Sequence, residues 1–179
     1  PVIAAAGYRA VAPDMRGYGR SSVYPRHEDY AVEHAVADML ELVDSLGRDR
    51  VVWVGHDWGS PVVWSLASHH PDRCHAVASL CVPYLPQGFT LHTVQPYVNR
   101  EIYPPAEYPA GQWDYMFFYE ENFARAQAQF EADPLATVRA MFRKGNPALR
   151  GKPSRMATTR RDGGHFGGLP TAPELPRDP

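Results

Sequence analysis

The stretch VVWVGHDWGS, residues 51–60, decides the fold of this 179-residue chain. Its four leading apolar residues predict a strand buried on both faces, as in a parallel sheet. Gly55 and Gly59 then flank Asp57, and the residues that follow favour a helix. A strand that enters a helix through so tight a turn is a nucleophile elbow, with a strained residue at its apex. The stretch therefore predicts that Asp57 is exposed at the C-terminal end of a sheet, with small neighbours needed on both sides to avoid clashes.

The rest of the first half alternates between helix and strand. Apolar runs predict strands over three segments: residues 7–14, 51–54 and 76–82. Apolar residues at helical spacing predict helices over residues 30–46 and 62–70. This β-α-β-α-β order predicts a parallel, doubly wound sheet with right-handed crossovers.

The second half has a different character. Residues 84–112 are rich in proline and tyrosine, show no strong period and are interpreted as a linker or excursion. Two helices are predicted over residues 113–131 and 134–144, and Asp133 stands at the N-cap position of the second. The apolar face of that second helix is expected to comprise Leu135, Val138, Met141 and Phe142.

The fold class predicted from these segments is α/β. Residues 1–84 are expected to form a partial core with three strands, and residues 85–179 part of a helical cap, or lid. The chain starts at Pro1 without a methionine, so we expect it to be a piece of a longer protein. The sequence does not indicate an oligomeric state.

Composition narrows the class of protein. Hydrophobic residues at 44% and charged residues at 21% are typical of a soluble globular domain, and a net charge of -2 gives no reason to expect nucleic acid as a partner. No apolar run approaches a membrane span, and no signal peptide is recognisable. Only Cys74 and Cys81 are present, so no structural disulfide is expected and the cytoplasm is the predicted location. We expect no metal and no organic cofactor, since no Cys/His cluster has ligand spacing.

An aspartate at the apex of an elbow selects a reaction class. A carboxylate can attack an electrophilic sp³ carbon and form an ester, which a water activated by a histidine would then hydrolyse. The following helix points its N-terminus at the site, and the backbone N–H of Trp58 is the expected oxyanion donor. The non-catalytic alternative is that the stretch is an ordinary strand-to-helix turn in which Asp57 only caps the helix.

Three stretches together resemble an epoxide hydrolase of the α/β-hydrolase superfamily. They are GYRAVAPDMRGYGRSS at residues 7–22, the elbow itself, and HHPDRCHAVASLCVPY at residues 69–84. The stretches WDYMFFYEENFARAQAQFEADP at residues 113–134 and RRDGGHFGGLP at residues 160–170 fit the cap of the same family. The resemblance implies an epoxide and water as substrates and a vicinal diol as product. It also implies that the HGxP loop, a second cap tyrosine, the relay acid and the catalytic histidine lie outside these 179 residues.

The resemblance also implies roles for individual residues. Asp57 matches the nucleophile, and Tyr115 matches one of two cap tyrosines that donate hydrogen bonds to the epoxide oxygen and protonate it. Tyr119, four residues later, is a local competitor for that role. His165 is not expected to be the base, because its glycine-rich loop matches the cap. Three residues near the elbow are expected to fix their own loop: Asp14, Arg16 and Arg20.

Two other functions stay open. Haloalkane dehalogenases share the aspartate nucleophile, and in them the tryptophan that matches Trp58 helps to hold the departing halide. The RGYGRSS loop and the surroundings of Tyr115 favour the epoxide group over the dehalogenases. The second alternative is that the chain as it stands is inactive or only a binding module, because none of its eight histidines is expected in the place of the catalytic base.

Overall fold

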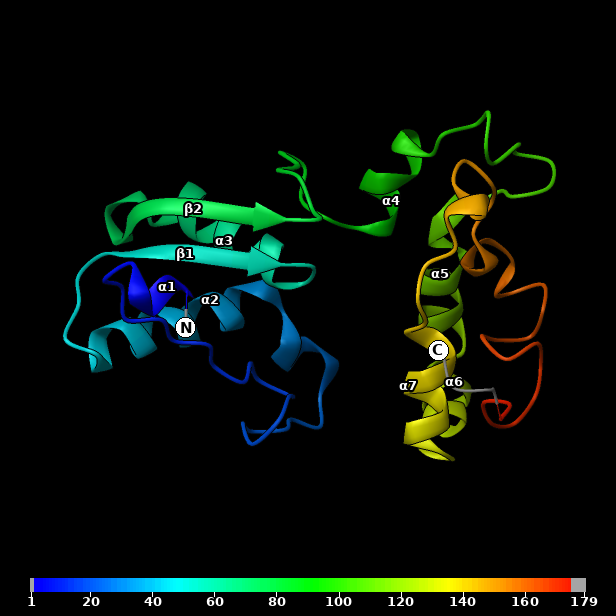
Figure 1. Ribbon diagram of the computed structural model, residues 1–179, viewed down its shortest axis with the longest axis horizontal. Helices are drawn as coiled ribbons and strands as arrows, with labels where there is room; N and C mark the ends of the chain where they lie inside the picture. The colour runs from blue at the N-terminus through cyan, green and yellow to red at the C-terminus, as the bar shows by residue number, and fades with distance from the viewer. Residues whose placement is uncertain (1, 175–179) are drawn as a thin grey trace. The chain divides into compact units, whose positions relative to one another are not determined.

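The computed structural model describes residues 2–174 and divides into two compact units. One unit extends to Gly88 and the other begins at Phe89. The first contains the strands, and the second is built from helices and turns (Figure 1). Each unit is described by itself.

The first unit is built on a pair of parallel strands. Strands β1 (Val51–His56) and β2 (Cys74–Leu80) are hydrogen-bonded side by side, and their arrows point the same way in Figure 1. Helix α3 (Gly59–His69) connects them and packs on both, and α2 (Val32–Ser45) packs on α3. These four elements lie within three residues of their predicted bounds, and the predicted parallel crossover is confirmed.

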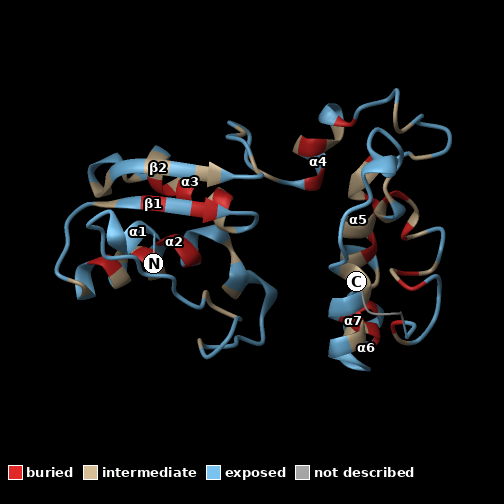
Figure 2. Ribbon diagram, in the orientation of Figure 1, coloured by how far each residue is buried: buried red, intermediate tan, exposed pale blue. Residues whose placement is uncertain are grey.

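The core of this unit lies between the sheet and the two long helices. Periodic apolar residues place Val36, Met39 and Val43 on one buried face of α2 (Figure 2). Trp53 contributes the buried side chain of β1, and Leu66 is completely buried on α3. The full cluster is Ala35, Val36, Met39, Val43, Trp53, Val62, Val63 and Leu66.

The strand predicted over residues 7–14 is wrong. Residues 8–15 form no strand, so the sheet within the described residues has two strands and not three. A strand exists only where a neighbour accepts and donates its backbone hydrogen bonds. An apolar run indicates that a segment can be extended, but it does not supply that neighbour. The residues before it form α1 (Val2–Ala5), a single exposed helical turn.

The second unit contains four helices among its described residues. The short α4 (Leu91–Val94) lies in the stretch interpreted as a linker, and α5 (Asp114–Glu121), α6 (Phe123–Glu131) and α7 (Pro134–Met141) follow. Residues 155–169, which we call the return segment, come back to these helices: its first turn packs on α5, and its last residue accepts a hydrogen bond from α6. The 3₁₀ turns of the two units are His27–Tyr30, Pro71–Arg73, Gln95–Tyr97, Gly111–Trp113, Pro147–Leu149 and Arg155–Thr158.

Two predictions for the second unit need correction, and one is confirmed. The single helix predicted over residues 113–131 is broken at Asn122 (φ −137°, ψ 39°), a residue type with weak helix propensity. The N-cap prediction is confirmed, because Asp133 Oδ1 accepts the N–H of Ala136 at 2.9 Å. Three of the four residues expected on the apolar face are exposed, namely Leu135, Val138 and Phe142, the last of them 78% accessible, whereas Thr137 is buried.

Candidate active site

The backbone of Asp57 has the geometry of an elbow apex. Its φ of +52° lies in the left-handed region, which costs energy for a residue other than glycine. Its N–H donates to the carbonyl of Leu80 at 3.2 Å, and its own carbonyl accepts the N–H of Ser60 at 2.9 Å. The strained residue is therefore held from both sides, by the neighbouring strand and by the first turn of α3.

The two glycines of the elbow have different reasons for being there. A Cβ at Gly55 would lie 2.4 Å from the carbonyl oxygen of Gly59 and 2.8 Å from Cγ2 of Val63, so only glycine fits. Apart from its chain neighbours and the backbone of its own helix, a Cβ at Gly59 would meet no atom of the described residues within 4 Å. The clash expected on both sides of Asp57 is thus found only on the strand side.

The carboxylate of Asp57 is exposed and partly held. The backbone N–H of Trp58 donates to Oδ1 at 2.9 Å, and the carboxylate stands at the N-terminus of α3, where the helix dipole favours an anion. The side chain of Trp58 is 56% exposed. An anion that one backbone donor orients and that stays accessible is suited to attack on a small electrophile.

No histidine of residues 2–88 is hydrogen-bonded to Asp57. His56, its neighbour in sequence, is an exposed residue at the end of β1. His69 lies at the other end of α3, with Nδ1 3.1 Å from the carbonyl of Ser65. His56 is thus a solvent-exposed residue and His69 a helix-end residue.

The loop before α2 is fixed by its own charged residues. The guanidinium of Arg16 donates two hydrogen bonds of 2.7 Å to the carboxylate of Asp38 on α2. The carboxylate of Asp14 accepts the backbone N–H of Arg20 at 3.1 Å. Arg16 and Asp14 thus have the loop-fixing contacts that the sequence predicted, and Arg20 takes part through its backbone.

Tyr115 lies on the first turn of α5, half-buried among aromatic rings of the second unit. Its ring meets that of Tyr119 edge-on at 5.6 Å and that of His165 at 6.0 Å. The hydroxyl of Tyr119 and Nε2 of His165 are 2.5 Å apart and hydrogen-bonded. Burial raises the pKa of Tyr119 and lowers the pKa of His165, so both are neutral near pH 7. The competitor Tyr119 is therefore engaged inside its own unit.

A buried ion pair supports the turn that carries Tyr115. Asp114 is 5% exposed, and its carboxylate accepts the backbone N–H of Arg160 at 2.8 Å and the Nε–H at 2.7 Å. The same guanidinium donates to Glu121, the last residue of α5, at 3.1 Å. Arg160 thereby ties the return segment to both ends of α5.

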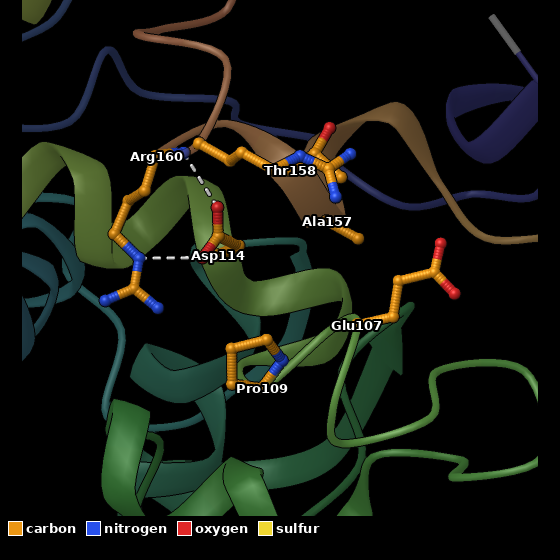
Figure 3. Close-up of a pocket in the computed structure, with 7 residues that line it drawn as sticks. Glu107, Pro109, Asp114, Ala157, Thr158 and Arg160 are labelled. Carbon is orange, nitrogen blue, oxygen red and sulfur yellow. Dashed lines mark hydrogen bonds and ion pairs between the residues drawn. The ribbon is translucent and has the colours of Figure 1, made fainter.

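A cavity of about 350 Å³ adjoins this ion pair (Figure 3). Figure 3 shows Asp114 facing Arg160, with two dashed lines between them. The cavity is lined by Glu107, Pro109, Asp114, Ala157, Thr158, Arg160 and Arg161. Asp114 and Arg160 neutralise each other in the cavity wall, so we assign them a structural role, the support of α5, and not a role in ligand binding.

The sequence did not single out three features of these units. They are the Asp114–Arg160 pair, the bond between Tyr119 and His165, and the contacts of Ser60 at the elbow. The partners in the first two are each separated by 46 residues, so no local pattern signals them. Ser60 could have been noticed as a small polar residue just before the helix predicted over residues 62–70.

The predicted site residues fall in both units. Asp57 and Trp58 are together in the first, joined by a hydrogen bond, and Tyr115 belongs to the second. The meeting of Tyr115 with Asp57 stays a prediction. Within residues 2–174, no three His, Cys, Asp or Glu side chains come together as a metal site, and no helix is long and apolar enough to cross a membrane.

Comparison with known proteins gives the family. A family model described as the alpha/beta hydrolase fold matches residues 1–170. The chain belongs to the alpha/beta hydrolase fold family. The elbow, the parallel crossover and the tightly packed Gly55 are the parts of that fold that the first unit contains.

Several curated proteins that are similar to the chain are epoxide hydrolases. Epoxide hydrolase A of Mycobacterium tuberculosis is 40% identical over 145 residues, which are 79% of this chain and 41% of that protein. Bifunctional epoxide hydrolase 2 of Sus scrofa is 33% identical over 180 residues, 99% of this chain and 29% of that protein. These likenesses confirm the resemblance seen in the sequence, and the chain spans less than half the length of either relative.

Solved structures that are similar to the chain are also epoxide hydrolases. The crystal structure of epoxide hydrolase A from Mycobacterium thermoresistibile matches with a TM-score of 0.62 and 32% identity, over 93% of this chain and 48% of that one. Epoxide hydrolase VrEH1 from Vigna radiata matches with a TM-score of 0.62 and 29% identity, over 81% of this chain and 42% of that one.

Proposed function

We propose that the whole protein opens epoxides to vicinal diols and that Asp57 is its nucleophile. The observation that carries the proposal is the carboxylate at the elbow apex, exposed and held by the N–H of Trp58 at 2.9 Å. The relatives named above, which are epoxide hydrolases, support the choice of substrate class.

In the first step an oxygen of Asp57 attacks one ring carbon of the epoxide. A new C–O bond forms as the ring C–O bond breaks, and the electron pair of that bond goes to the ring oxygen. A carboxylate suits this displacement at sp³ carbon, whereas a serine alkoxide suits attack on a carbonyl. The carboxylate stands at the N-terminus of α3, where the helix dipole favours a negative charge.

The ring oxygen must receive a proton as it becomes a hydroxyl. We assign the donor to Tyr115, whose place in the WDYMFFY stretch matches the cap tyrosine of the family. The assignment rests on that match, and the phenol of the competitor Tyr119 is hydrogen-bonded to His165. A phenol is a weak acid in water, with a pKa near 10, but it matches a developing alkoxide.

In the second step water attacks the ester carbonyl carbon and the diol leaves, which restores the carboxylate of Asp57. The N–H of Trp58 stabilises the tetrahedral oxyanion, a role that backbone donors fill in many acyl-transfer sites. The attacking water needs a base, and no histidine of residues 2–88 is bonded to Asp57. We therefore propose that the 179-residue chain by itself stops at the ester and does not turn over.

The test is the intact mass of the chain after incubation with styrene oxide. We expect a gain equal to one epoxide molecule, mapped to Asp57 in a peptide digest, and no gain in Asp57→Asn. Tyr115→Phe should slow ester formation about a hundredfold, the scale of a lost general acid, and Tyr119→Phe much less.

Three results would contradict the proposal. Equal modification of the wild type and of Asp57→Asn would show that Asp57 is not the nucleophile. Halide release from bromoalkanes without epoxide opening would favour the dehalogenase. If the chain reacts with neither substrate, the result would support the alternative that it is inactive or only a binding module.

A further inference from the structure

The carbonyl of Leu80, the last residue of β2, receives two hydrogen bonds at the elbow. One comes from the N–H of Asp57 at 3.2 Å and is the last backbone hydrogen bond between β1 and β2. The other is the hydroxyl of Ser60 at 3.0 Å. Ser60 has no accessible surface, and the carbonyl of Gly55 lies farther from the same hydroxyl, at 3.3 Å. The hydroxyl therefore donates mainly to the carbonyl that holds the nucleophile.

The chain turns sharply just after this carbonyl. Cys81 has a φ of +76°, and with Asp57 it is one of two non-glycine residues with positive φ among residues 2–174. The φ of Cys81 is the torsion beside the Leu80–Cys81 peptide, so it sets the orientation of the Leu80 carbonyl relative to the chain that follows. Beyond the turn, the carbonyl of Val82 accepts two hydrogen bonds, one from the indole N–H of Trp64 at 3.1 Å and one from the hydroxyl of Ser79 on β2 at 2.7 Å.

Ser60 and Trp64 are four residues apart, so they share one face of α3. Their side chains hold the carbonyls on the two sides of Cys81, those of Leu80 and Val82. We propose that Ser60 and Trp64 are positioning residues for Asp57, acting as a clamp on the turn after β2. The proposal rests on Asp57 being the nucleophile.

The clamp would act through geometry. Without it, the Leu80–Cys81 peptide can rotate toward a less strained conformation, and the bond to the N–H of Asp57 weakens. The apex residue could then leave its positive φ, and its carboxylate would move from the N–H of Trp58. Displacement reactions are sensitive to such shifts, because the attacking atom must be aligned with the breaking bond.

The test uses Ser60→Ala and Trp64→Phe, each of which deletes one donor, with Ser65→Ala as the matched control. Ser65 lies on the same helix, and its hydroxyl contacts only His69 among the hydrogen bonds of residues 2–88. Amide hydrogen exchange measured by NMR reports the elbow without any reaction. We expect exchange at Asp57 to accelerate about fivefold in both clamp variants, the scale of one net hydrogen bond, with α2 and the control unchanged.

Ester formation with styrene oxide gives the second measurement. The rate constant at saturating epoxide should fall about fivefold in Ser60→Ala and Trp64→Phe, with the half-saturating concentration unchanged. Unchanged exchange at Asp57, faster exchange throughout α2, or an unchanged rate constant would each overturn the clamp. A wild type that forms no ester would contradict the proposed nucleophile, while the exchange data would still decide whether Ser60 and Trp64 hold the elbow.

Discussion

Gly55→Ala and Gly59→Ala should have opposite effects, although the two glycines are symmetric about Asp57 in sequence. The added Cβ at Gly55 would lie 2.4 Å from the carbonyl oxygen of Gly59. A relaxed C···O contact is about 3.3 Å, so the two atoms must separate by about 0.9 Å. The obstacle is backbone and cannot rotate away, so α3 itself has to move.

The cost follows from this displacement. Forced overpacking of a rigid site destabilises by about 3 kcal/mol, which lowers the melting temperature of a unit of this size by roughly 15 °C. At Gly59, the first residue of α3, alanine meets open space and has the better helix propensity. We expect Gly59→Ala to be neutral or stabilising by about 0.5 kcal/mol.

Thermal unfolding by circular dichroism, together with the rate of ester formation at Asp57, would check both variants. Gly55→Ala should lose at least about tenfold in rate, because the moved helix carries the N–H of Trp58 away from the carboxylate. Equal melting temperatures for the two variants would refute the reasoning, since they would show that the close contact at Gly55 has no energetic weight.

Three further predictions concern single side chains. Asp57→Asn should abolish ester formation in a mass assay yet change the free energy of unfolding by no more than about 0.5 kcal/mol, because asparagine also accepts positive φ. Asp114→Asn should destabilise the second unit by about 3 kcal/mol in urea unfolding, because it breaks the buried pair with Arg160. Glu121→Gln, on the exposed side of Arg160, should lower the free energy of unfolding by less than about 0.5 kcal/mol. Equal losses for the two variants would contradict this prediction. Burial lowers the pKa of His165 from 6.5, so the imidazole binds a proton more tightly in the unfolded chain than in the folded one. The contribution of the neutral His165 to the free energy of unfolding is therefore complete above about pH 6.5 and declines as the pH falls toward the pKa of the folded state. His165→Gln keeps an acceptor for Tyr119 and should flatten the change in melting temperature between about pH 7.5 and about pH 5.5; parallel curves would argue against it.

The elements that the sequence predicted correctly are those with a local cause. Strand β1 has a continuous apolar run, α2 has an apolar face at helical spacing, and Asp133 caps α7 through its own side chain. The apex position of Asp57 follows equally from residues within two positions of it. Each of these predictions depends on contacts that a short window of sequence contains.

The errors concern partners that a window does not contain. Residues 8–15 have the apolar character of a strand, but pairing depends on a neighbour elsewhere in the chain. The break at Asn122 is not marked by proline or glycine, and it allows Tyr119 on α5 and Phe130 on α6 to contact the same imidazole of His165. The exposed face of α7 shows the same limit, because an apolar stripe does not reveal what covers it.

The return segment has a consequence for how the second unit folds. Its bonds to the helices join residues 46, 46 and 40 positions apart, at Asp114–Arg160, Tyr119–His165 and Gln129–Leu169. Helical turns form within about a microsecond, but long loops must lose chain entropy before such contacts form. We therefore expect this largely helical unit to fold at a rate set by closure of the chain between α7 and the return segment, more like a protein of high contact order than like a simple helical bundle.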